Sequence, residues 1–349
     1  MLRTRPFGKT GFNVTEVSMG GIPIIGMEDK DEAASVVNYA IDKGMNYLDN
    51  ARAYGNSEEK MGLVMKTRRD EVFLATKSHD RTYDGAWKHL ETSLHDLQTD
   101  HLDLWQVHDV STRDIWNEVM GPDGAFKAFA KARDEGIVKH IGITGHNDDT
   151  LCTAVESGEF ESVLCVYNLA IHSSGKKLLP LCKERGVAIC VMKPLSGGLF
   201  FRREELAIDP LRAWHFVLQN DCVSTGVAGA NCLRDIDQAI AASESFSPLT
   251  DEETAELVAK ATALGDNVCR NCQYCRDCPQ EIDVPKIMQM FDESRVFGYE
   301  WPRFRREYAA LEPKADACVE CNACLEACPF DLPVVERLQK FHAQFNQPV

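Results

Sequence analysis

Eight of the chain's 14 cysteines lie in its last 85 residues, in two groups of four. Within each group three cysteines follow at steps of three residues, and the last cysteine directly precedes a proline. Thiolates at this spacing can bind several irons of one cubane, and a remote Cys-Pro supplies the fourth ligand in two-cluster ferredoxins. The pattern therefore predicts iron–sulfur clusters. The eight candidate ligands are Cys269, Cys272, Cys275, Cys278, Cys318, Cys321, Cys324 and Cys328.

Zinc is the competing metal, because paired CxxC elements also form tetrahedral zinc sites. Each group here carries a third cysteine at the same step and a Cys-Pro, which favours [4Fe–4S] clusters. We expect two clusters; one cluster, with the other group vestigial or structural, is the alternative. The ligand sets expected from ferredoxins are Cys269, Cys272 and Cys275 with Cys328, and Cys318, Cys321 and Cys324 with Cys278.

A second set of residues, near the start of the chain, suits proton transfer. It consists of Asp49, Tyr54, Lys77 and His108. A tyrosine has an ordinary pKa of about 10, and a lysine ammonium a few ångströms away lowers it by stabilising the phenolate. We expect Lys77 to do this for Tyr54, Asp49 to hold Lys77, and His108 to orient a substrate oxygen. Taken singly, each residue also has a purely structural interpretation.

Three of these residues lie at the ends of predicted strands, and Tyr54 follows one of them. Apolar or β-branched runs alternate with amphipathic helical stretches, which indicates βα units and a parallel sheet. Eight such strands over roughly 250 residues are typical of a closed (β/α)8 barrel, whose strand ends build one functional rim. An open doubly wound sheet is the alternative, but no GxGxxG follows the first strand. The strands are predicted at 14–20, 45–50, 72–77, 102–108, 138–145, 162–168, 187–194 and 223–230.

Composition divides the chain into two domains. We expect a barrel at 1–264, closed by a helix at 249–265, and a mainly helical, ferredoxin-like iron–sulfur domain at 265–349. The formal net charge of −16 argues against nucleic acid or an anionic membrane as the main partner. No apolar stretch has the length of a signal peptide or a bilayer span, so we expect a cytoplasmic protein with reduced thiols.

The barrel segment resembles the aldo/keto reductases from about Leu2 to about Ser245. FGKTGFNVTEVSMGG resembles that family's N-terminal hairpin and first strand, and LDNARAYGNSE resembles its tetrad segment. Lys77 in ATKS and His108 in LWQVH fall where the third and fourth tetrad members are expected. The stretch CQYCRDCPQEIDVP is similar to the tail of an iron–sulfur branch of this family. The resemblance implies Tyr54 as general acid, with NADP(H) exchanging hydride with a carbonyl or alcohol substrate.

The same resemblance implies a cofactor site. MKPLSGGL (192–199) resembles the loop over the pyrophosphate, and GANCLRDIDQ (229–238) the segment around the adenosine phosphate. Two departures concern the nicotinamide: the usual Gln before Asn168 is missing, and Thr144, Gly145 and His146 stand where a Ser-Asn pair is common. The implied cofactor-binding residues are Asn168, Lys193, Pro194, Leu195, Gly197, Gly229, Asn231 and Arg234.

Three functions follow from these patterns. We expect an NADP(H)-dependent carbonyl reductase or alcohol dehydrogenase whose clusters are structural or serve a ferredoxin-like partner. In the first alternative, the clusters feed single electrons from a ferredoxin-like donor to a substrate at the rim. The second alternative is a non-enzymatic electron-transfer subunit. NADPH delivers two electrons together and clusters pass them singly, and no flavin motif joins the two.

Overall fold

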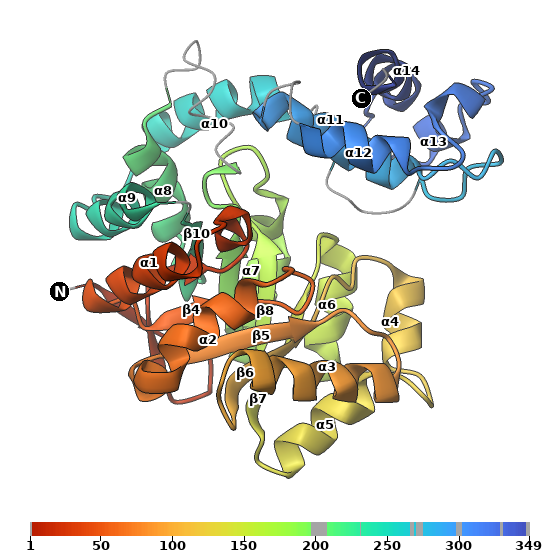
Figure 1. Ribbon diagram of the computed structural model, residues 1–349. Helices are drawn as coiled ribbons and strands as arrows, with labels where there is room; N and C mark the ends of the chain where they lie inside the picture. Colours follow the sequence, from red (N-terminus) through yellow and green to blue (C-terminus); the bar gives the residue numbers. More distant parts are fainter. Residues whose placement is uncertain are drawn as a thin grey trace. The chain divides into compact units, whose positions relative to one another are not determined.

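The computed structural model describes residues 2–196, 208–230, 232–265, 269, 275–297, 302–328 and 331–346. The chain forms two compact units, Met1–Val258 and Ala259–Val349, and the division falls within helix α10 (Asp251–Gly265). Figure 1 shows the elements of both. None of the described helices is long and apolar enough to cross a membrane.

Eight parallel strands close into a barrel in the first unit, in the order β10-β3-β4-β5-β6-β7-β8-β9. This confirms the predicted (β/α)8 architecture, and the doubly wound alternative is wrong. The strands are β3 (Val17–Gly20), β4 (Tyr47–Asp49), β5 (Phe73–Ser78), β6 (Leu102–Val107), β7 (Val138–Thr144), β8 (Ser162–Val166), β9 (Ala188–Met192) and β10 (Thr225–Gly229).

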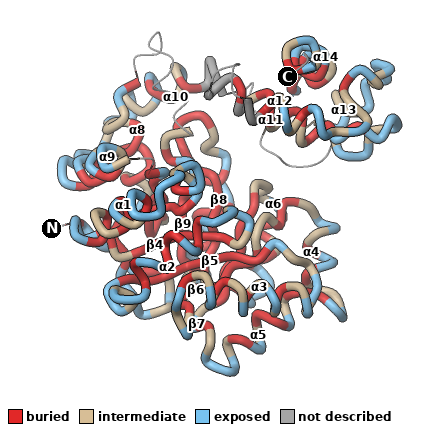
Figure 2. The backbone as a smooth tube through the Cα atoms, viewed as in Figure 1, coloured by how far each residue is buried: buried red, intermediate tan, exposed pale blue. Residues whose placement is uncertain are grey.

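Helices surround this barrel, and their buried faces turn to the strands (Figure 2). In α1 the predicted apolar stripe, which includes Val36 and Ala40, is buried, and the Asp29 side chain caps the first turn. Gly44 follows α1 with φ +91°, a left-handed conformation that glycine adopts at little cost. The helices of this unit are α1 (Lys30–Asp42), α2 (Ser57–Arg68), α3 (Tyr83–Asp96), α4 (Arg113–Val119), α5 (Phe126–Asp134), α6 (Asp148–Ser157), α7 (Leu178–Arg185), α8 (Pro210–Leu218) and α9 (Leu233–Glu244), with 3-10 turns η1 (Pro23–Gly26), η2 (Arg69–Glu71) and η3 (Ser173–Lys176).

The first predicted strand, 14–20, is in fact two strands that belong to different sheets. β1 (Thr4–Pro6) and β2 (Asn13–Thr15) form an antiparallel hairpin outside the barrel, and β3 begins at Val17. The break lies at Glu16, whose buried carboxylate accepts a hydrogen bond from Arg5 Nε at 3.1 Å and another from Ser243 Oγ at 2.8 Å. A carboxylate is buried here because these partners replace its water.

The hairpin contributes to the barrel's interior. Phe7 and Val14 are fully buried among residues such as Tyr47 and Phe73, which begin β4 and β5. The Phe7 and Phe73 ring centroids lie 5.0 Å apart. Aromatic side chains therefore fill the end of the barrel where the strands start, and the opposite end remains for a site.

The second unit is mainly helical, as predicted. Its described elements are the end of α10, α11 (Val284–Phe297), α12 (Pro302–Ala309), η6 (Ala315–Ala317), α13 (Ala323–Glu326) and α14 (Val334–Phe345). Their apolar faces form a core of their own, which includes Ile287, Phe304, Leu338 and Phe341. Six of the candidate ligand cysteines are partly buried against this core.

Candidate functional site

Lys77 and Asp49 form a buried ion pair at the carboxyl ends of neighbouring strands. The register pairs Asp49 of β4 with Ala75 of β5, so Lys77 lies two residues further on and faces the same way. Lys77 Nζ contacts Asp49 Oδ2 and donates a hydrogen bond to the Asn50 carbonyl oxygen at 2.6 Å. Gln106 Nε2 donates to the other Asp49 oxygen at 3.0 Å. The ammonium is thus fixed in position by paired groups.

Tyr54 and His108 complete the group. Lys77 Nζ lies 5.0 Å from the centroid of the Tyr54 ring, and the Tyr54 and His108 ring centroids are 5.7 Å apart, nearly perpendicular at 83°. Tyr54 and His108 are half-buried, whereas Lys77 and Asp49 are buried. The structure therefore brings the four sequence-predicted residues together, with two of them facing solvent in part.

Burial governs the ionisation of Tyr54. It raises the pKa of Tyr54, and the Lys77 ammonium opposes that shift without overcoming it. The expected net lowering is therefore corrected: the pKa of Tyr54 lies above its ordinary value. Burial also disfavours the charge on Lys77, but Asp49 and Tyr54 outweigh it and the pKa of Lys77 is raised. At neutral pH the site holds a protonated phenol beside an ammonium.

His108 is neutral at physiological pH. Burial, together with the charges of Lys77, His79 and Arg81, lowers the pKa of His108 well below its ordinary value. Its Nδ1 is buried and has no hydrogen-bond partner among the described residues. A neutral imidazole carries one N–H donor and one acceptor, and so it can donate to a substrate oxygen without carrying a charge.

Gln106 is a site residue that the sequence reasoning missed. It is buried in β6, and its amide nitrogen fixes the Asp49 carboxylate. Its position offered one signal, because residues two apart in a strand face the same side and Gln106 lies two before His108.

Asn168 holds a loop with its amide. Its Nδ2 donates to the Lys193 carbonyl oxygen at 2.8 Å, and its Oδ1 accepts from the backbone N–H groups of Ala170 and Ile171, each at 2.9 Å. Of the adjoining cofactor candidates, Lys193 is exposed, Pro194 is buried and Leu195 is half-buried. Gly197 and Asn231 lie outside the described residues.

Three observations bear on the fit of a dinucleotide phosphate. Ser196 Oγ, within the predicted pyrophosphate loop, is buried without a hydrogen-bond partner among the described residues. Gly229 ends β10 and is exposed, and Arg234 is exposed in the first turn of α9. The N-cap residue of α9, Cys232, gives no side-chain cap. A helix N-terminus and an arginine suit an anionic phosphate.

His146 stands where the Ser-Asn pair was expected. Its backbone N–H donates to Ser111 Oγ at 3.0 Å. Burial and the nearby charge of Lys193 lower the pKa of His146 to about 4, although Asp109 acts in the opposite direction. A second neutral imidazole thus lies near His108, and its hydrogen-bonding atoms are of the type that an amide recognises.

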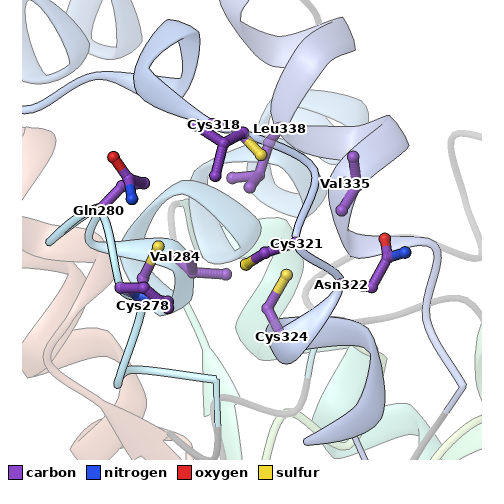
Figure 3. A pocket seen from close by; sticks show the side chains of 11 residues that line it. Cys278, Gln280, Val284, Cys318, Cys321, Asn322, Cys324, Val335 and Leu338 are labelled. Carbon is purple, nitrogen blue, oxygen red and sulfur yellow. The ribbon is translucent and has the colours of Figure 1, made fainter.

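Four of the predicted ligand cysteines line one cavity in the second unit, with apolar walls that include Val284 and Leu338 (Figure 3). Burial raises the pKa of Cys324, and its thiol also interacts with the other three. Cys321 is exposed. Among the described residues, no three His, Cys, Asp or Glu side chains are grouped as a single-ion site. The four cysteines are Cys278, Cys318, Cys321 and Cys324.

The other predicted ligand set is described in part. Cys269, Cys275 and Cys328 are half-buried against the same helical core, and Cys272 lies outside the described residues. The backbone N–H of Cys269 donates to Asp292 Oδ2.

Comparisons with known proteins agree with these two units. Residues 19–213 match the model of the aldo/keto reductase family, and residues 268–332 match that of the 4Fe-4S dicluster domain. The chain therefore belongs to the aldo/keto reductase family, in a branch with a C-terminal 4Fe-4S domain.

The chain spans about two thirds of the length of the curated relatives it matches, and the matches cover just over half of this chain. An uncharacterized oxidoreductase of Bacillus subtilis, YqkF, is 29% identical over 212 residues, which are 57% of this chain and 66% of YqkF. L-galactose dehydrogenase of Arabidopsis thaliana is 28% identical over 216 residues, 57% of this chain and 67% of that protein. The holo form of aldo-keto reductase AKR11C1 from Bacillus halodurans has a TM-score of 0.65 at 24% identity, covering 75% of this chain and 97% of that one. This last likeness shows the fold alone.

Proposed function

We propose that this chain reduces a small carbonyl compound, or oxidises the corresponding alcohol, with NADP(H), and that Tyr54 is the general acid/base. The observation that carries the proposal is the buried Lys77 ammonium, which is bound to Asp49 on one side and lies beside the Tyr54 ring on the other. A buried cation adjoining a half-buried phenol is the arrangement that proton donation to an oxygen requires.

Four residues of the site have separate roles at the carbonyl oxygen of the substrate. Neutral His108 donates a hydrogen bond to that oxygen and orients it, and Tyr54, protonated at neutral pH, gives up its proton. Lys77 stabilises the phenolate that remains, because opposite charges interact strongly in a buried site. Asp49, fixed by Gln106, keeps the ammonium charged and aimed. In alcohol oxidation the same groups act in reverse.

The fit of NADP(H) is supported at its phosphate end. Arg234, Gly229 and the N-terminus of α9 would hold the adenosine phosphate, and Lys193, Pro194, Leu195 and Ser196 would flank the pyrophosphate. Asn168 would act by fixing the Lys193 backbone, and His146 would take the place of the usual carboxamide contact. When bound, the cofactor supplies or accepts the hydride. Gly197 and Asn231 remain candidates from the sequence.

In the second unit we propose a [4Fe–4S] cluster in the cavity lined by Cys278, Cys318, Cys321 and Cys324. Paired CxxC elements alone would suit zinc equally well. The third cysteine and the Cys-Pro of each group, together with the match of residues 268–332 to the 4Fe-4S dicluster domain, favour a cluster. We propose a second cluster on Cys269, Cys272, Cys275 and Cys328.

One feature favours a redox role for the first cluster. Cys321 is exposed at the cavity, so a cluster bound there would lie close to solvent. A cluster near the surface can exchange single electrons with a protein that docks beside it, and a ferredoxin-like protein is the class of partner that would exchange them. The runner-up function, reduction of a barrel substrate by cluster electrons in place of hydride, rests on the same feature.

An anaerobic preparation with reconstituted clusters tests the proposal. NADPH binding is measured by quenching of protein fluorescence, and turnover is measured on a panel of small carbonyls with NADPH or with dithionite as the donor. We expect saturable binding and carbonyl-dependent NADPH oxidation. Tyr54→Phe should lower the rate at least about a hundredfold, because the proton donor is lost.

Tyr39→Phe is the matched control, since the Tyr39 hydroxyl donates to Asp237 on the barrel's outer helices. Parental turnover in Tyr54→Phe would remove both enzymatic functions. Turnover with dithionite but no binding of NADPH would refute hydride transfer and support the runner-up.

A further inference from the structure

Arg52 connects the segment between Asp49 and Tyr54 to neighbouring elements of the barrel. Arg52 Nη1 lies 2.5 Å from Glu58 Oε2 and 2.5 Å from Asp96 Oδ2, and its Nη2 donates to the Gly55 carbonyl oxygen at 3.3 Å. The backbone N–H of Arg52 donates to the carbonyl oxygen of Lys77 at 3.0 Å. This single residue therefore joins the segment to α2, α3 and β5.

Glu58 extends the connection to the strand that carries Lys77. Its side chain is fully buried, and its Oε1 accepts a hydrogen bond from Thr76 Oγ1 at 2.5 Å. Thr76 directly precedes Lys77. Burial raises the pKa of Glu58, while Thr76 and Arg52 oppose that shift. A buried carboxyl with these partners is costly to rearrange, because any movement leaves it unpaired.

The segment needs such a support. Tyr54 lies in a turn between β4 and α2, and Gly55 beside it has φ +53°, where glycine imposes little restraint. Connecting segments move more readily than strands, whereas a proton donor must be held within a fraction of an ångström of its working position. Asp49 and Lys77 lie in strands β4 and β5, and His108 directly follows β6.

We infer that Arg52 and Glu58 are positioning residues for Tyr54. Neither side chain reaches the reacting atoms; they act by fixing the 50–55 segment against α2, α3 and β5. The inference rests on the proposed function for its catalytic consequence, because the consequence requires Tyr54 to be the acid. The structural consequence, a fixed environment for the Tyr54 phenol, is independent of it.

The test compares Arg52→Gln and Glu58→Gln with Arg68→Gln. Arg68 is the matched control: at the other end of α2 it also pairs with two carboxylates, Asp42 at 2.7 Å and Glu71 at 2.8 Å, both on the surface. We expect kcat for NADPH-driven carbonyl reduction to fall about ten- to a hundredfold in the first two variants, as misplacement of a reacting group does. The Kd of NADPH and the control's kcat should change less than about twofold.

Chemical rescue separates positioning from general damage. In Arg52→Ala, guanidinium chloride at low millimolar concentration should restore part of the lost kcat, because the ion can occupy the space between Glu58 and Asp96. Sodium chloride at the same concentration should not, and neither salt should raise kcat in Arg68→Ala. Equal responses to both salts would contradict the inference.

A readout without turnover uses ultraviolet difference titration. The ionisation of Tyr54 is isolated by subtracting the titration of the Tyr54→Phe derivative in each background. We expect its midpoint to move down toward the ordinary tyrosine value in Arg52→Gln and Glu58→Gln. Unchanged midpoints and unchanged kcat, in variants with the control's near-ultraviolet circular dichroism, would overturn the inference. Full activity of Tyr54→Phe would instead refute the proposed function and leave the titration result standing.

Discussion

At Tyr54, burial and a neighbouring ammonium act on the same phenol in opposite directions. The sequence could predict that Lys77 is the cation beside Tyr54, because Lys77 lies at the end of one strand, Tyr54 follows another, and both strands end at the same rim. The net direction of the Tyr54 pKa shift could not be predicted, since it depends on how completely residues distant in sequence exclude water from the phenol. Gln106 was missed for a related reason: a polar side chain in an apolar strand shows its role only when its partner, Asp49, is in place.

The pKa directions predict the pH profile of carbonyl reduction. Tyr54 must be protonated and its pKa is raised, so kcat/KM should stay level from about pH 7 to about pH 10 and fall only above that. His108 acts as a neutral donor and its pKa is lowered, so any acid-side loss should have its midpoint well below about 6.5. Steady-state rates across this range check the prediction. A descending limb centred between pH 7 and 9 would contradict Tyr54 as the acid.

His146 predicts how stability depends on pH. Its pKa is about 4 in the folded chain and about 6.5 when unfolded, so between these values the unfolded chain binds more protons. The free energy of unfolding should therefore fall as the pH drops from about 6.5 to about 4. In His146→Asn the fall should be smaller, as measured by urea unfolding at pH 7.5 and 5.

At the scale of elements, the barrel strands could be predicted because fully buried parallel strands are continuous apolar runs. The 14–20 segment shows the limit of that signal. Its residues are suitable for a strand throughout, but Glu16 is bound by Arg5 and Ser243, more than 200 residues apart, and the strand divides there. Periodicity describes neighbours along the chain and carries no information on such distant partners.

The 3-10 turn η1, between β3 and α1, depends on a lysine of another element. Lys60 of α2 is buried, and its Nζ donates to the carbonyl oxygens of Ile24, Ile25 and Met27 at 2.7, 3.0 and 2.6 Å. Lys60→Met should lower the free energy of unfolding by about 1–3 kcal/mol, because three carbonyls, that of Ile24 buried, lose this donor. Lys66→Met, on the exposed side of the same helix, should change it by less than about 0.5 kcal/mol. Equal effects in urea unfolding would disprove this role of Lys60.

At the scale of the whole molecule, the uneven distribution of cysteines indicated a second unit, and the structure has a second core in that part of the chain. The pairing of Cys278 with the later group could be predicted from ferredoxin spacing, and these four cysteines line one cavity. The cavity itself could not be predicted, because α11, α13 and α14 supply its walls. The domain boundary at 264/265 stays a prediction.

Cysteine variants test the ligand sets. With two [4Fe–4S] clusters the chain should carry about eight irons, and Cys324→Ala or Cys278→Ala should each lower this to about four. Iron and sulfide analysis and electron paramagnetic resonance of the reduced protein provide the measurement. Cys222→Ala, in the barrel unit, should retain all of the iron. Full iron content in Cys324→Ala would rule out the proposed cluster in this cavity, and complete loss would favour a single cluster.

The N-terminal hairpin has a consequence for how molecules come and go. Because Phe7 and Val14 pack beneath the first residues of the strands, the hairpin closes that end of the barrel. A substrate can therefore reach Tyr54 only from the end of the barrel where the strands terminate, and the product must leave from the same end. An inhibitor bound at this opening would slow both substrate entry and product release.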